Sequence, residues 1–120
     1  MAGARELTRR GMTHAKEGQL RDAVRSYDQA ILAADHLPAL MNRACAYYHL
    51  GDFERAARDS SWALEIDRKR TPMWLVRGLA RFHLGDAERA SKDLAKYLRL
   101  DTKTPYRALA KRALRKLQTA

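Results

Sequence analysis

The sequence predicts an all-α fold, built as an array of similar helix–turn–helix units. A six-residue phrase that opens with glycine and ends with alanine recurs three times, at Gly18–Ala23, Gly51–Ala56 and Gly85–Ala90. Its glycines, at positions 18, 51 and 85, are 33 and 34 residues apart, and a fixed period of this length is typical of repeat proteins. Between the phrases, apolar residues follow helical spacing.

The period divides the chain into three repeats and a final helix. The repeats cover about residues 4–36, 37–70 and 71–104, and the final helix covers about residues 105–118. Two helices in each repeat and one at the end give seven helices. A chain of 120 residues with this organisation forms a single domain.

The second repeat shows how each unit is built. Its first helix opens at Pro38 and carries apolar residues at helical spacing as far as Tyr48. Gly51 follows, and its freedom to adopt a positive φ suits a helix end and a tight turn. Asp52 is then expected to cap the second helix, which extends to Ile66.

Small residues recur at one place in each helix of a repeat. The first helices carry Gly11, Ala44 and Gly78, and the second helices carry Ala23, Ala56 and Ala90. Small side chains at fixed places let two antiparallel helices approach closely. The repeated residues therefore predict tight packing inside every unit.

These features resemble the tetratricopeptide repeat, a helix–turn–helix unit of about 34 residues. Trp74–Gly78 resembles the Trp-x-x-x-Gly opening of its first helix, and Tyr27–Ile31 resembles the aromatic-then-alanine pattern of its second helix. The resemblance implies a right-handed superhelical array, an α-solenoid, in which the first helices line a concave face. It also implies that residues 105–118 form the capping helix.

The final helix carries one apolar stripe and a basic remainder. The stripe consists of Tyr106, Leu109, Ala110, Ala113, Leu114 and Leu117. A capping helix turns its apolar side towards the array and its charged side towards water. We therefore expect the whole stripe to face inward.

The resemblance implies a protein–protein interaction module that binds a peptide or an amphipathic helix of a partner in the concave groove. Carried over position by position, the groove residues are Arg5, Thr8, Arg9, Met12, Lys16, Met41, Asn42, Cys45, Tyr48, His49, Leu75, Leu79, Phe82 and His83. The basic residues at the N-terminal edge would steer acidic flanks of the partner, and the methionine, leucine and aromatic side chains would supply contact area. In two alternative readings, the apolar residues pack between helices, or two copies bury their grooves against each other as a homodimer.

The groove departs from the best-known ligand site of the family, a clamp for the carboxylate tails of heat-shock chaperones. The five clamp positions, which the family fills with lysine, asparagine, asparagine, lysine and arginine, read Thr8, Met12, Asn42, Pro72 and Val76 here. Asn42 alone is retained, and apolar groups cannot pair with a carboxylate. A co-chaperone-type carboxylate-tail binder is therefore the weaker alternative.

The net charge of +10 is unevenly distributed, because residues 71–104 contribute +3 and residues 105–120 contribute +5. The cluster Arg68–Arg70 and the basic final helix suit an acidic protein surface, or they form a solvated cap. RNA and lipid are the less favoured partners, because Tyr106 is the one aromatic residue among these charges.

No catalytic or cofactor-binding pattern is visible, so the sequence predicts neither an enzyme nor a cofactor. Cys45, His49 and His83 could lie close together, but a structural zinc site needs four ligands, and we predict no metal. Asp59 and Asp93 are expected to cap helices or to pair with Arg55 and Arg89, one turn away on the same helix.

The expected location is the cytoplasm. One cysteine, Cys45, fits a reducing compartment. The first residues lack the apolar region of a signal peptide, and no apolar run approaches the roughly 18 residues of a membrane span.

Overall fold

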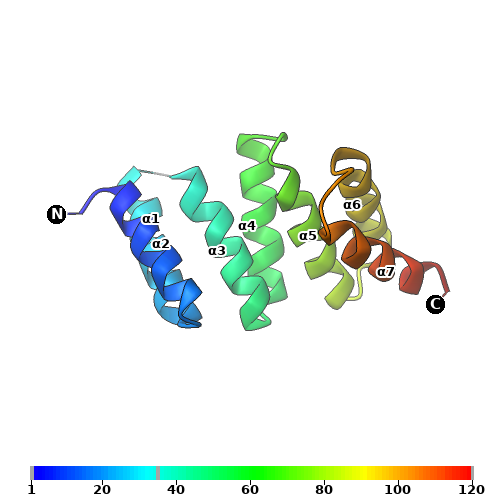
Figure 1. Ribbon diagram of the computed structural model, residues 1–120, viewed down its shortest axis with the longest axis horizontal. Coiled ribbons are helices and arrows are strands. Elements are labelled where there is room, and N and C mark those ends of the chain that lie inside the picture. Colours follow the sequence, from blue (N-terminus) through cyan, green and yellow to red (C-terminus); the bar gives the residue numbers. More distant parts are fainter. Residues whose placement is uncertain (1, 35, 120) are drawn as a thin grey trace.

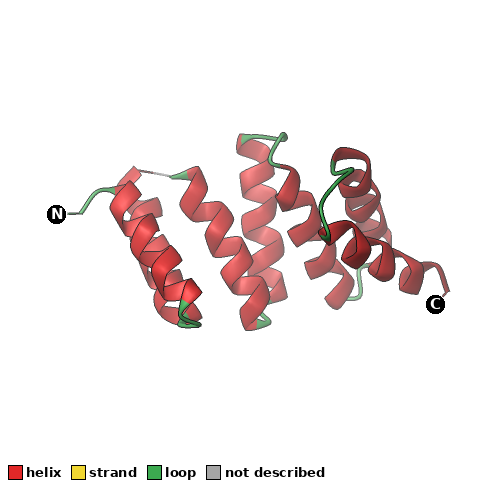
Figure 2. Ribbon diagram, viewed as in Figure 1, coloured by secondary structure: helices red, strands yellow, loops and turns green. Residues whose placement is uncertain are grey.

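The computed structural model describes residues 2–34 and 36–119. These residues form seven helices and no strand: α1 (Ala4–Lys16), α2 (Leu20–Ala34), α3 (Leu37–Leu50), α4 (Phe53–Ile66), α5 (Thr71–His83), α6 (Ala87–Leu100) and α7 (Tyr106–Thr119). The helices stack along an elongated body of 51 × 25 × 24 Å, with α1 near one end and α7 near the other (Figures 1 and 2). The predicted all-α helical-repeat solenoid is confirmed.

The three recurring glycines make the turns between the paired helices. Gly18, Gly51 and Gly85 have φ values of 79°, 81° and 81°, a region that residues with a Cβ adopt only with strain. The carboxylate of Asp52 then accepts a hydrogen bond of 3.2 Å from the backbone N–H of Arg55, which caps α4. Asp86 caps α6 in the same way.

The small residues sit where paired helices touch. A Cβ placed on Gly11 would lie 2.3 Å from Cε1 of Tyr27 in α2, and a Cβ on Gly78 would lie 2.9 Å from Leu94 in α6. Both distances are far shorter than the roughly 3.5–4.0 Å of a favourable carbon–carbon contact. The predicted close packing within the units is confirmed.

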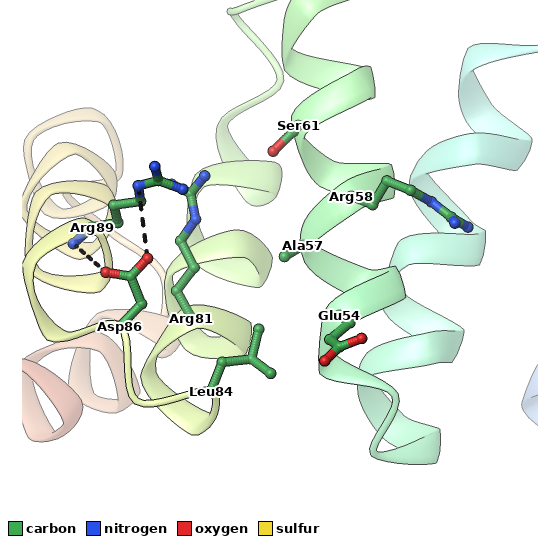
Figure 3. A pocket seen from close by; sticks show the side chains of 8 residues that line it. All are labelled: Glu54, Ala57, Arg58, Ser61, Arg81, Leu84, Asp86 and Arg89. Carbon is green, nitrogen blue, oxygen red and sulfur yellow. Dashed lines mark hydrogen bonds and ion pairs between the residues drawn. The ribbon is translucent and has the colours of Figure 1, made fainter.

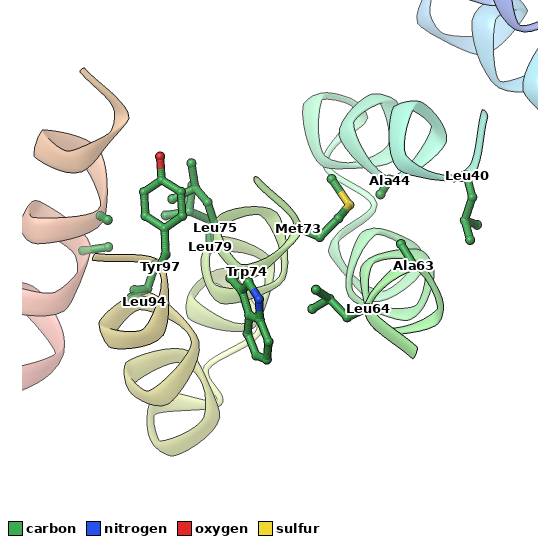
Figure 4. Packing of buried hydrophobic residues seen from close by; sticks show 12 residues of the cluster. Leu40, Ala44, Ala63, Leu64, Met73, Trp74, Leu75, Leu79, Leu94 and Tyr97 are labelled. Carbon is green, nitrogen blue, oxygen red and sulfur yellow. The ribbon is translucent and has the colours of Figure 1, made fainter. Parts of the chain in front are cut away.

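Two hydrophobic clusters form the core. The smaller one joins α1, α2 and α3 around Tyr27, and the larger one extends from α3 to α7 around Met73 and Leu94. Figure 4 shows the larger cluster, with Leu94 and Tyr97 of α6 packed beside Leu75 and Leu79 of α5. The array is thus one continuous stack, because each helix pair buries its apolar face against its neighbours.

Buried ion pairs join the two helices of a repeat. Asp59 of α4 has no accessible surface and accepts hydrogen bonds of 2.7 and 3.0 Å from the guanidinium of Arg43 in α3. Asp93 of α6 accepts bonds of 3.0 and 2.9 Å from Arg77 of α5 in the same way.

The expected partners of these aspartates were wrong. Arg55 pairs with Asp52, and Arg89 pairs with Asp86, both in the turns that precede their helices. The reason is orientation, because Asp59 faces the neighbouring helix, whereas the Arg55 side chain is 57% exposed on the outer side of α4.

The stripe of α7 is only partly buried. Ala110 and Ala113 are buried, and the larger core cluster also contacts Leu114 and Leu117. Tyr106 and Leu109 remain 60% and 39% exposed, although they lie on the side of α7 that faces α3 and α5, so the start of the helix is packed less tightly than its middle. Of the described helices, none has the length and apolar character required to cross a bilayer.

Candidate interaction site

An apolar pocket of about 570 Å³ opens between α3, α5 and α7, a volume typical of ligand-binding pockets. We call it the α3–α5–α7 pocket. Its wall consists of Cys45, Tyr48 and His49 from α3, Thr71, Pro72, Leu75, Val76 and Leu79 from α5, Tyr97, Leu100, Asp101 and Thr104 at the end of α6 and in the following loop, and Tyr106 and Leu109 from α7.

The pocket brings together five of the fourteen predicted groove residues: Cys45, Tyr48, His49, Leu75 and Leu79. Leu75 and Leu79 are only 8% and 5% exposed and belong to the larger core cluster. They form the floor of the pocket, and most of their surface packs between helices, as the alternative reading expected. A charged substitution at Leu79 would therefore disturb the core as well as the pocket.

Three further predicted residues lie on α3 and α5 outside the pocket wall. Phe82 and Met41 are half-buried against the larger core cluster. The ring of His83 stacks on Phe53 at a centroid distance of 4.3 Å, and its Nε2 lies 3.3 Å from the hydroxyl of Tyr48. The contacts of His83 therefore tie the end of α5 to α3 and α4.

The predicted residues of α1 do not reach the pocket. Arg5, Arg9, Met12 and Lys16 are exposed along α1. Thr8 is 5% exposed, and its hydroxyl donates a hydrogen bond of 2.8 Å to the carbonyl of Ala4. The structure therefore does not offer Thr8 as a contact, because its hydroxyl is buried and already bonded within its own helix.

Asn42 also uses its donor locally. Its amide Nδ2 donates a hydrogen bond of 2.9 Å to the carbonyl of Pro38, four residues earlier in α3. Pro72 and Val76, at the two clamp positions of α5, lie in the pocket wall. The part of the face where the family carries cations is thus apolar in this chain.

The sequence did not predict the part of the pocket wall that lies in and after α6, nor Thr71 at the start of α5; the missed residues of the former part are Tyr97, Leu100, Asp101, Thr104, Tyr106 and Leu109. One signal was available at Tyr97, which stands where the family favours alanine. Its buried hydroxyl donates to the carboxylate of Asp101. Asp101 therefore belongs to the structural support of the pocket.

Asp101 shapes the loop that leads into α7. Its carboxylate accepts hydrogen bonds from the hydroxyl of Thr104 and from the backbone N–H groups of Lys103 and Thr104, the latter two at 3.0 Å each. The bonds from Thr104 and then Tyr97 hold the pKa of Asp101 well below its usual range. The loop so fixed presents Tyr106 and Leu109 at the pocket rim.

The polar side chains at the pocket do not form a reactive or metal-binding centre. Burial raises the pKa of the Cys45 thiol, which keeps the sulfur protonated and weakly nucleophilic. Across residues 2–34 and 36–119, no three His, Cys, Asp or Glu side chains converge as a metal site. The pocket is suited to apolar contact.

The chain belongs to the tetratricopeptide repeat family. The family's sequence profile, described as tetratricopeptide repeat, matches residues 37–70 and 71–104, which together span more than half of the chain. This is a family of protein-interaction scaffolds and not of enzymes. Among curated proteins, none matches the sequence.

Solved tetratricopeptide domains share the architecture over almost the whole chain. The first such domain of Spaghetti (RPAP3), bound to the HSP90 peptide SRMEEVD, is 31% identical with a TM-score of 0.85, covering 97% of this chain and 93% of that one. The domain of OM64 from Arabidopsis is 29% identical with a TM-score of 0.89 and covers 97% and 94%. The second domain of human RPAP3, in complex with the HSP70 peptide SGPTIEEVD, is 28% identical with a TM-score of 0.85 and covers 96% and 94%.

Proposed function

We propose that the chain binds a peptide or an amphipathic helix of a partner protein by inserting an apolar side chain into the α3–α5–α7 pocket. The observation that carries the proposal is the apolar wall of this pocket, which includes the clamp positions Pro72 and Val76. Structural relatives bind peptide tails that end in Glu-Glu-Val-Asp. This chain keeps their scaffold and changes the chemistry of the surface.

Carboxylate-tail binding is the weaker candidate, because a carboxylate that leaves water must meet charged or hydrogen-bonding donors. The five clamp positions provide none that is free. Thr8 and Asn42 are bonded within their own helices, and Met12, Pro72 and Val76 are apolar. We expect the peptide SRMEEVD to bind this chain more weakly than about 1 mM, an affinity of roughly 4 kcal/mol.

The exposed apolar side chains at the pocket rim favour binding through an apolar anchor of the partner. Leu100, Tyr106 and Leu109 are 45%, 60% and 39% exposed around the pocket. Their burial by a partner would contribute roughly 25 cal/mol for each Å² of apolar surface removed from water. Arg5, Arg9 and Lys16, exposed on α1 of the same array, would attract acidic residues that flank the anchor and mainly raise the association rate.

The test is a peptide-library selection against three forms of the chain: wild type, Leu109→Glu and Leu32→Glu. Leu109 lies at the pocket rim, whereas Leu32 is 86% exposed on α2. Both substitutions place the same charge on an exposed leucine, so both variants should keep the wild-type helix content and melting temperature. We expect peptides with apolar anchors to be enriched on wild type and Leu32→Glu, with an affinity at least about tenfold lower for Leu109→Glu.

Three results would overturn the proposal. Selected peptides could bind Leu109→Glu as well as wild type, which would place recognition elsewhere. Tails ending in a free carboxylate could dominate the selection, which would favour the clamp reading. Sedimentation could show a dimer that Leu109→Glu dissociates, and then the pocket would bury a second copy of the chain.

A further inference from the structure

A second groove carries strong positive charge and shares no lining residue with the α3–α5–α7 pocket. It is formed by α4, α5 and α6 and has two adjoining hollows of about 480 and 450 Å³ that both include Arg81 and Arg89. Together the two linings contain eight lysine and arginine residues against three carboxylates. We call this surface the basic groove.

One place in the basic groove has a counterpart in the preceding repeat, where a carboxylate is bound. There, Nη1 of Arg43 in α3 donates to the carboxylate of Asp28 in α2 at 2.9 Å. One repeat later, at the equivalent positions, Nη1 of Arg77 donates to the hydroxyl of Ser61 at 3.2 Å. Ser61 of α4 thus stands where α2 has Asp28, and the negative charge at this place is missing beside Arg77.

The charge balance at this place is shifted further by a second arginine. Arg81 occupies the position that corresponds to Tyr47, and its Nη1 donates to Asp93 at 2.8 Å. Asp93 therefore serves both Arg77 and Arg81, which leaves one excess positive charge beside Ser61. Figure 3 shows Ser61 on α4 facing Arg81 and Arg89 across the groove, and Asp86 bonded to Arg89.

The place is open to a ligand. In the preceding repeat, the side chain of Asp28 is 44% exposed, so a carboxylate at this position is reached from solvent. The side chains of Arg77 and Arg81 are 16% and 18% exposed. Their N–H groups are held in position by Asp93, and fixed donors of this kind favour a planar carboxylate.

The groove continues as a basic stripe along α6, formed by Arg89, Lys92, Lys96 and Arg99. From Arg89 to Arg99 the helix rises about 15 Å, the length of about four or five residues of an extended peptide. Trp74, the aromatic residue of the groove, is 8% exposed and lies beneath Arg77 and Lys96. It offers no free ring to a nucleic-acid base, so the surface suits acidic side chains better than single-stranded RNA.

We propose that the basic groove binds an acidic segment of a partner protein, with one carboxylate placed between Ser61, Arg77 and Arg81, where the preceding repeat holds the carboxylate of Asp28. The remaining acidic residues of the segment pair with the stripe on α6. This interaction is independent of the apolar pocket, so one partner can use both surfaces or two partners can use one each.

The test measures the affinity of labelled hexaglutamate for wild type and for Ser61→Asp, which supplies the missing carboxylate from within the chain. We expect Ser61→Asp to weaken binding by about tenfold or more, because the internal carboxylate competes for the same N–H groups. Gln29→Glu, at an exposed position on α2, adds the same charge elsewhere and should weaken binding by less than about threefold. Ser61→Asn, which adds no charge, should also have a small effect.

Equal losses for Ser61→Asp and Gln29→Glu would contradict the proposal, because they would reduce the interaction to general charge attraction. Failure of hexaglutamate to bind wild type more tightly than hexaglutamine would also contradict it. The proposal would also be overturned if a decauridylate RNA bound wild type more tightly than hexaglutamate does and if Ser61→Asp weakened that binding. The site beside Ser61 would then bind phosphate groups of a nucleic acid and not the carboxylates of a protein.

Discussion

In the second repeat one arginine serves two carboxylates, whereas in the third repeat one carboxylate serves two arginines. Arg43 is bonded to Asp28 and Asp59, while Asp93 is bonded to Arg77 and Arg81. The backbone arrangement that supports these pairs is the same, because the residues occupy equivalent places in neighbouring units. A longer contact of 3.8 Å also joins the exposed Arg58 to Asp59, so the charges around Arg43 balance, whereas the cluster around Asp93 keeps one excess positive charge.

This difference shows how a repeat scaffold separates stability from binding. Around Arg43 of the second repeat, the chain itself supplies both carboxylates, Asp28 from α2 and Asp59 from α4. Burial alone would lower the pKa of Arg43, but the hydrogen bonds that its guanidinium donates to Asp59 and Asp28 raise the pKa overall, so the guanidinium stays charged. In the third repeat the leftover positive charge faces the basic groove. The apolar pocket lies against this repeat as well, so both proposed surfaces gather in the C-terminal half of the array.

Replacing Arg43 or Arg77 should have the largest effect on stability of the changes considered. Arg43→Met leaves Asp59, which has no accessible surface, without its two-bond partner, and loss of one partner of a buried pair costs about 3–5 kcal/mol. Arg77→Met should cost less, about 1–3 kcal/mol, because Asp93 keeps a hydrogen bond of 2.8 Å from Arg81, whereas Asp59 keeps only the exposed Arg58 at 3.8 Å. Urea unfolding of both variants provides the measurement, and equal losses would show that Arg81 does not substitute for Arg77.

The close helix contacts provide a second comparison between repeats. In Gly11→Ala the new Cβ meets the ring of Tyr27, which is 1% exposed, so the stability should fall by about 1–3 kcal/mol. In Gly78→Ala the Cβ meets the more flexible side chain of Leu94, and the loss should be smaller. Thermal unfolding of the two variants tests this order of stability losses. A Gly11→Ala variant that is more stable than Gly78→Ala would contradict the observed packing.

Ser61→Asp tests the comparison between the Arg43 and Arg77 clusters, with the smallest expected effect on stability. The substitution gives Arg77 the second carboxylate that Arg43 already has, and a partly exposed ion pair with Arg77 should stabilise the chain by at most about 1 kcal/mol. Chemical unfolding of Ser61→Asp and Ser61→Asn at low and high salt separates charge from packing. If only Ser61→Asn stabilised the chain, charge at position 61 would not determine its stability.

Most of the fold could be predicted from the period of the sequence repeats. Recurring glycines, the capping aspartates and the small residues at helix contacts are local signals, and each has one structural solution. They place the first six helices, with α3 ending next to Gly51 and α5 ending two residues before Gly85. The family resemblance then assigns the first helices to one common face.

The ion pairs and the pocket wall could not be predicted in the same way. The spacing of one helical turn favoured Arg55 for Asp59, but which side of a helix faces its neighbour depends on packing. A usable signal was present, because Arg43 and Arg77 recur with the same period as Asp59 and Asp93. The exposure of Tyr106 and Leu109 depends on the orientation of α7, which is fixed by the loop around Asp101. This loop is not part of the repeating pattern, so the repeat period does not predict that orientation.

The most direct test of the central claim is a ¹⁵N NMR titration of the wild-type chain with a library-selected peptide. The account predicts that shift changes gather on α3, α5 and α7 around Tyr48, Val76 and Leu109, and that they disappear in Leu109→Glu and persist in Leu32→Glu. Shift changes centred instead on Arg5, Arg9 and Met12 of α1 would show that the partner binds at the N-terminal end, and the proposed pocket would be wrong.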